Sequence, residues 1–103
     1  MRTLLITLCL ALSIGAPAQA ATPKECVVLL HGLWRSPTSM RVMGDALELA
    51  GYDIVNLGYP STKAPIQDLI EVAVTPAVEA CGDRTVHFVT HSMGGILTRA
   101  WLS

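Results

Sequence analysis

The pattern of apolar and polar positions after residue 25 predicts three short strands. Residues 26–30 (CVVLL) are apolar throughout and rich in valine, as expected of a strand that is buried on both faces. Residues 52–57 and 85–90 form two further short runs in which apolar residues predominate, and glycine-containing turns lie beside both. We therefore expect three strands in this part of the chain.

A helix is predicted between the first two strands. Ser36 and Pro37 are typical of an N-cap and a first helical position, and Gly51 is typical of a helix end. Between them, apolar residues recur at helical spacing and predict one buried stripe, which consists of Met40, Met43, Leu47 and Ala50.

Two more helices are predicted after the second strand. Residues 65–80 carry apolar side chains at helical spacing, namely Ile66, Leu69, Ile70, Ala73 and Ala77. Pro76 lies inside this segment and should kink or break the helix, because proline lacks an N–H and its ring clashes with the preceding turn. Residues 94–102 have a helix-like composition and run to the end of the chain.

The predicted order is strand, helix, strand, helix, strand, helix. Such alternation is typical of an α/β fold, in which helices cover a parallel sheet and the crossovers are right-handed. Ligands of these sheets bind beyond the carboxyl ends of the strands. Two short motifs, His-Gly at 31–32 and His-Ser-Met-Gly-Gly at 91–95, fall at such ends, so we expect a functional site there.

The first twenty residues have the three parts of a secretory signal peptide. Arg2 gives a positive start, residues 4–16 are an uncharged apolar run, and residues 17–20 (PAQA) predict cleavage after Ala20. The apolar run of 13 residues is shorter than the roughly 20 residues of a membrane-spanning helix, so no stable membrane anchor is expected. We expect residues 21–103 to form part of one domain that is periplasmic or extracellular.

Composition narrows the classes of function. The 103 residues hold 7 basic and 8 acidic side chains, so the chain lacks the basic surface of a typical nucleic-acid-binding protein. No spacing of His, Cys, Asp or Glu is typical of a metal site, and neither a metal nor a cofactor is expected.

Two cysteines, Cys26 and Cys81, lie after residue 20. In an oxidising compartment they can form one intramolecular disulfide. Two buried free thiols are the alternative interpretation, because unpaired cysteines are among the most buried residues.

Ser92 lies between a predicted strand and a predicted helix. Residues 89–95 (VTHSMGG) fit a sharp turn that strains the serine backbone and raises its hydroxyl above the sheet, while Gly94 lets the helix pass close to the strand. The N–H groups at the start of the helix favour a developing negative charge. This layout is typical of a nucleophile elbow, although Thr90 stands where the usual Gly-x-Ser-x-Gly pattern has its first glycine.

With these motifs the chain resembles the α/β-hydrolase superfamily, and within it the bacterial secreted lipases and esterases. The resemblance runs from residue 26 to the end and is carried by Leu-Leu-His-Gly-Leu at 29–33 and His-Ser-Met-Gly-Gly at 91–95. It implies that Ser92 is the nucleophile and that the backbone N–H groups of Leu33 and Met93 form the oxyanion hole. The supporting motif residues would be His31, Gly32, His91, Gly94 and Gly95.

The activity implied by this resemblance is hydrolysis of a carboxylic ester, of a small molecule or a lipid, through an acyl-serine intermediate and without a cofactor. Acyl transfer, amide hydrolysis or thioester hydrolysis on the same fold are alternatives.

In this superfamily Asp or Glu and then His follow the serine, whereas residues 93–103 contain none of them. We therefore expect the N-terminal part of an α/β-hydrolase fold with its C-terminal part missing; the alternative is a truncated, non-catalytic remnant.

The superfamily's sheet order places the first strand between the other two, so both outer strands would be exposed edges. In that order Cys26 and Cys81 lie at the end of the sheet opposite the site, which favours a disulfide that links adjacent strands.

His31 is the best substitute for the missing base, although the resemblance gives it the role of holding the oxyanion loop by hydrogen bonding.

Three further residues lie near the expected site. Trp34 and Arg35 follow the oxyanion loop and are candidates for an acyl pocket, while Trp34 covering part of the core is the alternative. Tyr59 is interpreted as a turn residue on the rim of the site.

Overall fold

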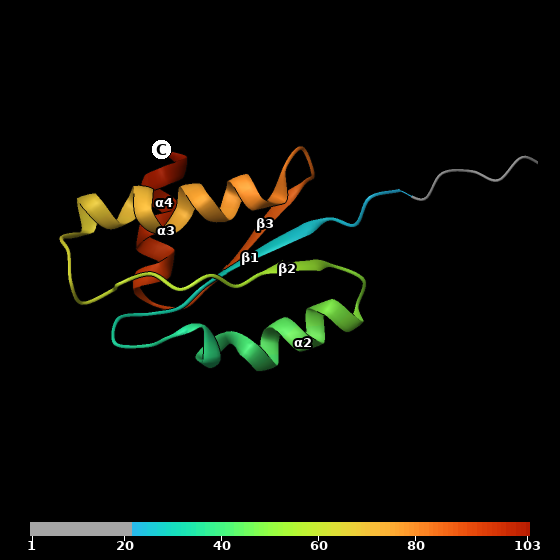
Figure 1. Ribbon diagram of the computed structural model, residues 1–103, viewed down its shortest axis with the longest axis horizontal. Helices are drawn as coiled ribbons and strands as arrows, with labels where there is room; N and C mark the ends of the chain where they lie inside the picture. Colours follow the sequence, from blue (N-terminus) through green and yellow to red (C-terminus); the bar gives the residue numbers. More distant parts are fainter. Residues whose placement is uncertain (1–21) are drawn as a thin grey trace, which may run out of the picture.

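The computed structural model describes residues 22–103 (Figure 1), and the predicted signal peptide lies outside them. The elements in chain order are β1 (Cys26–Leu30), the 3-10 helix η1 (Pro37–Met40), α2 (Arg41–Leu49), β2 (Asp53–Val55), α3 (Ile66–Cys81), β3 (Val86–Thr90) and α4 (Met93–Leu102). Among residues 22–103, no helix has the length and apolar character needed to cross a membrane.

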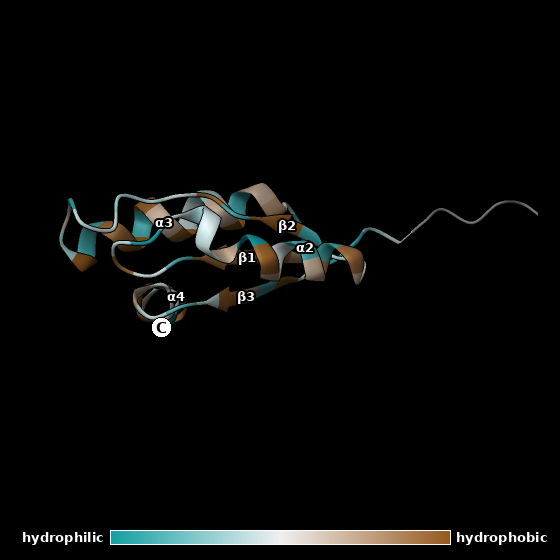
Figure 2. Cartoon of the chain, turned by 90° about the horizontal axis from the view of Figure 1, so that it is seen from below, coloured by the Kyte–Doolittle hydropathy of each residue, from teal (hydrophilic) through white to brown (hydrophobic). Residues whose placement is uncertain are grey.

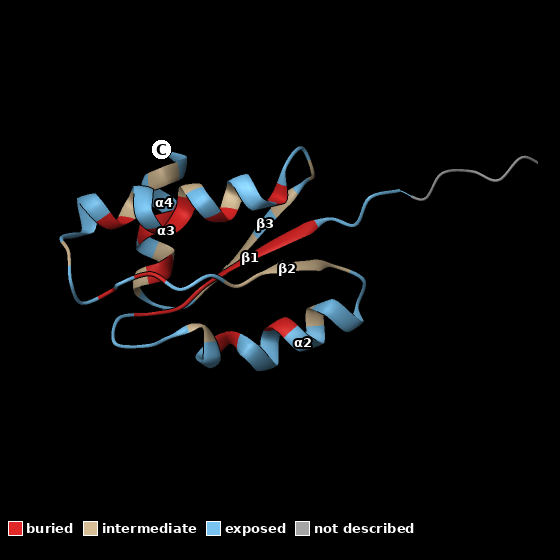
Figure 3. Cartoon of the chain, in the orientation of Figure 1, coloured by how far each residue is buried: buried red, intermediate tan, exposed pale blue. Residues whose placement is uncertain are grey.

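The three strands form one parallel sheet in the order β2-β1-β3 (Figure 2). Cys26 pairs with Asp53 in β2 and with Val86 in β3, and the pairing with β3 continues to Leu30 and Thr90. β1 is buried along its whole length because it has a strand on each side and helices on both faces (Figure 3). The predicted parallel three-stranded core with flanking helices is therefore confirmed.

Alternate side chains of β1 enter two separate hydrophobic clusters. On one face, Val27 and Leu29 pack with Met40 of η1. On the other face, Val28 and Leu30 pack against buried residues of α3 and α4. The period of two along a strand therefore attaches η1 and α2 to one side of the sheet and α3 and α4 to the other.

α3 is one continuous helix through Pro76, so of the predicted kink or break the break does not occur. Pro76 lies on the exposed side of α3, and Val72, whose carbonyl loses its helical hydrogen bond, is also exposed. Water can satisfy that carbonyl, and the buried face of α3 holds the rest of the helix against the sheet. This face consists of Leu69, Ala73, Val74, Ala77 and Cys81, whereas Ile66 is exposed.

The helix after β1 also differs in detail from its prediction. Its first turn is 3-10, and the Ser36 side chain does not cap it; instead the Ser36 carbonyl accepts hydrogen bonds from the N–H and the hydroxyl of Ser39. Met43 is 47% exposed, and Gly44 takes its place on the buried face. A Cβ at Gly44 would lie 3.1 Å from Leu29 Cδ1, so the missing side chain allows the close approach of α2 to β1.

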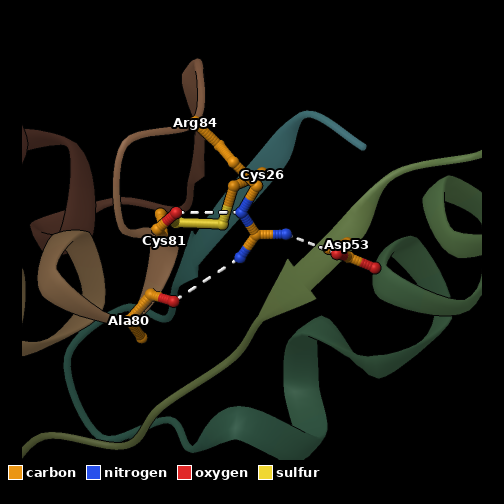
Figure 4. A network of polar contacts seen from close by, with 5 residues as sticks. All are labelled: Cys26, Asp53, Ala80, Cys81 and Arg84. Atoms are coloured by element: carbon orange, nitrogen blue, oxygen red, sulfur yellow. Dashed lines mark hydrogen bonds and ion pairs between the residues drawn. A yellow bond between two sulfur atoms is a disulfide. The ribbon is translucent and has the colours of Figure 1, made fainter. Parts of the chain in front are cut away.

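Cys26 and Cys81 form a disulfide between the start of β1 and the end of α3, at the amino end of the sheet (Figure 4). Arg84 lies beside it and donates from Nε to the Cys81 carbonyl at 2.8 Å. The same guanidinium pairs with the Asp53 carboxylate at the start of β2. One covalent and one ionic link therefore join α3, β1 and β2 at the edge remote from residues 31–32 and 91–95.

We expect removal of the disulfide by the double substitution Cys26→Ala/Cys81→Ala to lower the free energy of unfolding by about 4 kcal/mol. The bond closes a sequence separation of 55 residues, and the chain-entropy relation for a loop of that length gives this size. Urea unfolding with and without reductant measures the effect, and under reductant the two proteins should become nearly equal.

Intact mass gives an independent check that does not require the variant to fold. The native, unreduced protein should take up no alkylating reagent at Cys26 or Cys81, and both should react after reduction. Two thiols that alkylate freely before reduction would contradict the pairing.

Candidate active site

The sheet brings the two sequence motifs together at the carboxyl ends of β1 and β3. Leu30 pairs with Thr90, and the His91 N–H donates to the Leu30 carbonyl at 3.0 Å, so His31 and His91 leave the sheet side by side. The loop after β1 lies directly against the loop after β3. A Cβ built on Gly32 would lie 2.8 Å from His91 Nδ1 and 3.2 Å from Ser92 Cβ.

Ser92 occupies a strained backbone conformation between β3 and α4. Its φ of 53° and ψ of −118° lie in a region that residues other than glycine rarely adopt. Such strain has an energy on the order of 1–3 kcal/mol and persists only where the surrounding structure imposes it. Here the Gly94 N–H donates to the His91 carbonyl and the Gly95 N–H to the Ser92 carbonyl, which closes the turn and leaves Ser92 exposed.

The glycines that follow Ser92 make room for the sharp turn. A Cβ at Gly94 would lie 2.5 Å from the Leu30 carbonyl oxygen, closer than any side chain can approach. A Cβ at Gly95 would lie 3.1 Å from Thr90 Oγ1. The threonine that replaces the first glycine of the usual pattern thus lies close to Gly95, which has no side chain to crowd it.

Two backbone N–H groups beside Ser92 are available to a ligand. Met93 is the first residue of α4, where a helix leaves its N–H groups without intrahelical partners. Leu33 lies in the turn closed by the hydrogen bond from the Arg35 N–H to the Gly32 carbonyl at 3.1 Å. Within residues 22–103, neither the Leu33 nor the Met93 N–H donates to a protein acceptor.

His31 is buried and its imidazole is fully engaged. Nδ1 lies 2.9 Å from the Gly32 carbonyl, and Nε2 accepts the Tyr59 N–H at 3.4 Å. These contacts suit a neutral imidazole that carries its proton on Nδ1, since Nδ1 faces an acceptor and Nε2 faces a donor. The imidazole therefore has no nitrogen left over to take a proton from Ser92.

Tyr59 is a central residue of this arrangement and was underestimated from the sequence. Its ring stacks on His31 with centroids 4.2 Å apart, and its hydroxyl donates to the His31 carbonyl. Burial raises the pKa of the Tyr59 hydroxyl above its ordinary value of 10.0, so the hydroxyl stays a donor at neutral pH. A signal existed: Tyr59 follows the carboxyl end of a strand, and a tyrosine buried there needs a polar partner.

The loop after Gly32 is held from a distant part of the chain. Trp34 has a φ of 63°, and its N–H donates to the hydroxyl of buried Ser61 at 3.2 Å. Its side chain is 81% exposed, so Trp34 does not cover the core. Ser61 was not singled out in the sequence, because a serine in a turn has no pattern that marks it as a buried acceptor.

The other two histidines have different surroundings. His87 pairs with Glu25 at 2.6 Å near the amino end of the sheet, far along β3 from Ser92. His91 is exposed beside Gly32. No histidine of the part of the chain described by the structure hydrogen-bonds the Ser92 hydroxyl, and the same residues contain no cluster of three or more metal-ligating side chains.

Comparisons of the chain with models of protein families, with curated proteins and with solved structures each gave no match. The α/β architecture with a three-stranded parallel sheet stands on the structure alone.

We expect Gly94→Ala to lower the free energy of unfolding by about 3 kcal/mol, because the new methyl group overlaps the Leu30 carbonyl and must push α4 away from β1. Gly95→Ala is the matched control. Its neighbour is the rotatable Thr90 hydroxyl, and the gain in helix propensity of about 1 kcal/mol offsets the crowding. Urea unfolding of the two variants measures the difference, and equal losses would contradict this packing.

We expect Tyr59→Phe to lower the free energy of unfolding by about 1–2 kcal/mol, since the buried His31 carbonyl loses its donor while the ring stack remains. The same experiment at high pH adds a second check. The phenol of Tyr59 loses its proton near pH 10.0 in the unfolded chain but only at a higher pH in the folded chain. The stabilisation that the Tyr59 hydroxyl provides is therefore complete below pH 10.0 and is lost as the pH rises through the folded pKa. The difference between wild type and Tyr59→Phe should therefore shrink above pH 10, and a difference that grows there would contradict the assignment.

Proposed function

We propose that this chain carries the nucleophile and the oxyanion hole of a serine hydrolase of the lipase or carboxylesterase type. The observation that carries the proposal is Ser92 itself. It has a positive φ at a strand-to-helix turn, and the Gly32–Leu33 loop lies against it. A strained, exposed serine beside two free N–H groups suits acyl transfer better than a structural role.

The reaction that this geometry supports has two steps. Ser92 Oγ attacks the carbonyl carbon of an ester, and the oxygen that becomes negative is stabilised by the Leu33 N–H in the loop after β1 and by the Met93 N–H at the start of α4. The alcohol leaves with a proton and an acyl-serine remains. Water then attacks the acyl-serine, which releases the carboxylic acid and restores the Ser92 hydroxyl.

His31 and Tyr59 support this chemistry without taking part in proton transfer. The stack and the three hydrogen bonds of His31 fix the start of the loop that presents the Leu33 N–H. Because a hydrogen-bond donor stabilises an oxyanion only when it is preorganised, this buried contact is the part of the site most sensitive to loosening.

The serine also needs a general base, because its hydroxyl is a weak nucleophile without one. His31 is occupied, His87 lies near the other end of β3, and no Asp, Glu or His follows Ser92 in the sequence. The proposal therefore requires a general base and an acidic partner that residues 22–103 do not supply at Ser92. That no histidine within residues 22–103 hydrogen-bonds the Ser92 hydroxyl favours one alternative, a chain that is non-catalytic by itself.

We further propose that the protein works in an oxidising compartment after export. The leader-like pattern of residues 1–20 and the Cys26–Cys81 pair both agree with this location.

A fluorophosphonate probe tests the nucleophile directly. In a protein that also supplies the general base, we expect the probe to modify Ser92, and Ser92→Ala to abolish both the labelling and the hydrolysis of 4-nitrophenyl butyrate, with a rate loss of at least about 10⁴-fold. Ser36→Ala is the matched control, because Ser36 is exposed in the same region and its hydroxyl caps no helix. Peptide mass mapping locates the label.

The outcomes separate the two interpretations. Ester hydrolysis that survives Ser92→Ala would refute Ser92 as the nucleophile. With the base present, a properly folded protein that shows neither labelling nor turnover would favour the non-catalytic alternative.

A further inference from the structure

A hollow that reaches His91, the residue before Ser92, lies on the face of the sheet that carries η1 and α2. Its volume is about 290 Å³, and it is lined by Arg35, Ser39, Met40, Met43, Val89, Thr90 and His91. It runs beside the carboxyl-terminal end of β3, and His91 is the residue directly before Ser92. The hollow therefore ends one residue away from Ser92 along the chain.

The hollow has an apolar floor and a polar rim. Met40 and Val89 belong to one hydrophobic cluster of the core, and Met43 adds a flexible thioether side chain above it. Ser39 and Arg35 provide the polar rim, together with His91 at the end nearest to Ser92. A limited volume with these walls fits a short alkyl chain that ends in a polar group.

Arg35 determines which polar group fits. The ion pairs within residues 22–103 are Arg84 with Asp53 and His87 with Glu25, so no carboxylate of this part of the chain neutralises Arg35. A guanidinium has five donors in a planar fork and binds carboxylates in a bidentate manner. The charge at the rim of this hollow therefore complements an anion.

We propose that this hollow is the acyl subsite and that Arg35 selects esters whose short acyl chain carries a carboxylate, such as the half-esters of dicarboxylic acids. The subsite deepens the proposed function, because only acyl transfer at Ser92 gives it an acyl group to hold. In the bound ester the reacting carbonyl lies at Ser92, the methylene groups lie over Met40, Met43 and Val89, and the distal carboxylate accepts hydrogen bonds from Arg35.

Binding of two matched amides to the complete chain tests the subsite without any turnover. The anionic probe is the N-methylamide of adipic acid with one free carboxylate, and the neutral probe is N-methylhexanamide, which replaces that carboxylate by a methyl group. Methyl-labelled methionines report binding in NMR titrations, and the Met40 and Met43 signals should shift with the anionic probe. We expect the anionic probe to bind about tenfold more tightly than the neutral one, the size of a charge-assisted hydrogen bond.

Variants of Arg35 then test whether this residue causes the preference for the anionic probe. Arg35→Gln should weaken the anionic probe about tenfold and leave the neutral probe unchanged, and Arg35→Lys should retain part of the preference because it keeps the charge but loses the bidentate fork. Arg41→Gln is the control, since Arg41 is exposed on α2 and does not line the hollow. Circular dichroism verifies that each variant is folded.

Equal affinity for the two probes, or an anionic preference that survives Arg35→Gln, would overturn the proposal; the latter would place the carboxylate at the Leu33 and Met93 N–H groups instead. These results do not depend on the nucleophile. Absence of fluorophosphonate labelling would count against Ser92 and leave a measured Arg35 selectivity standing, whereas labelled Ser92 with no Arg35 selectivity would refute the subsite alone.

Discussion

The close approach of α4 to the end of β1 is the constraint on which the whole carboxyl edge of the sheet depends. Gly94 lies so near the Leu30 carbonyl that no side chain fits between them. The chain can leave β3 and enter a helix at once only because this contact is allowed, and the positive φ of Ser92 is the conformation that makes the direction change. The backbone energy stored at Ser92 is therefore balanced by the packing of α4 on β1 and β3.

A second set of contacts stabilises the neighbouring loop in a different way. The loop after β1 has few apolar contacts of its own, and Leu33 and Trp34 are both exposed. Its conformation is instead imposed by buried polar groups from the segment after β2, where Tyr59 contacts His31 and Ser61 receives the Trp34 N–H. Because a buried polar group that loses its partner is costly, this network specifies one loop conformation rather than merely adding stability.

The sequence predicted the features that depend on local pattern. The apolar run of β1, Gly51 at the end of a predicted helix and the alternation of strands with helices led to the parallel sheet that is observed. The parts that depend on tertiary contacts could not be read in this way. Pro76 was expected to interrupt a helix that packing on the sheet keeps intact, and Met43 fits a helical stripe although its position turns away from the core. Tyr59 and Ser61 acquire their roles only through residues about 28 positions earlier, a separation at which no sequence periodicity operates.

The disulfide of this chain also changes its covalent topology. Cys26 and Cys81 enclose η1, α2, β2 and nearly all of α3 in one ring, and this ring includes the exposed loop around Lys63. A protease that cuts this loop once opens the ring but releases no fragment, since the two pieces stay joined through sulfur. The contacts of Tyr59 and Ser61 lie on one side of such a cut, and β3 with Ser92 lies on the other. Because the disulfide links the two pieces, each has a high effective concentration near the other, which favours the assembled state. The ring thus lets this small sheet stay in one covalent piece after a single cut in that loop.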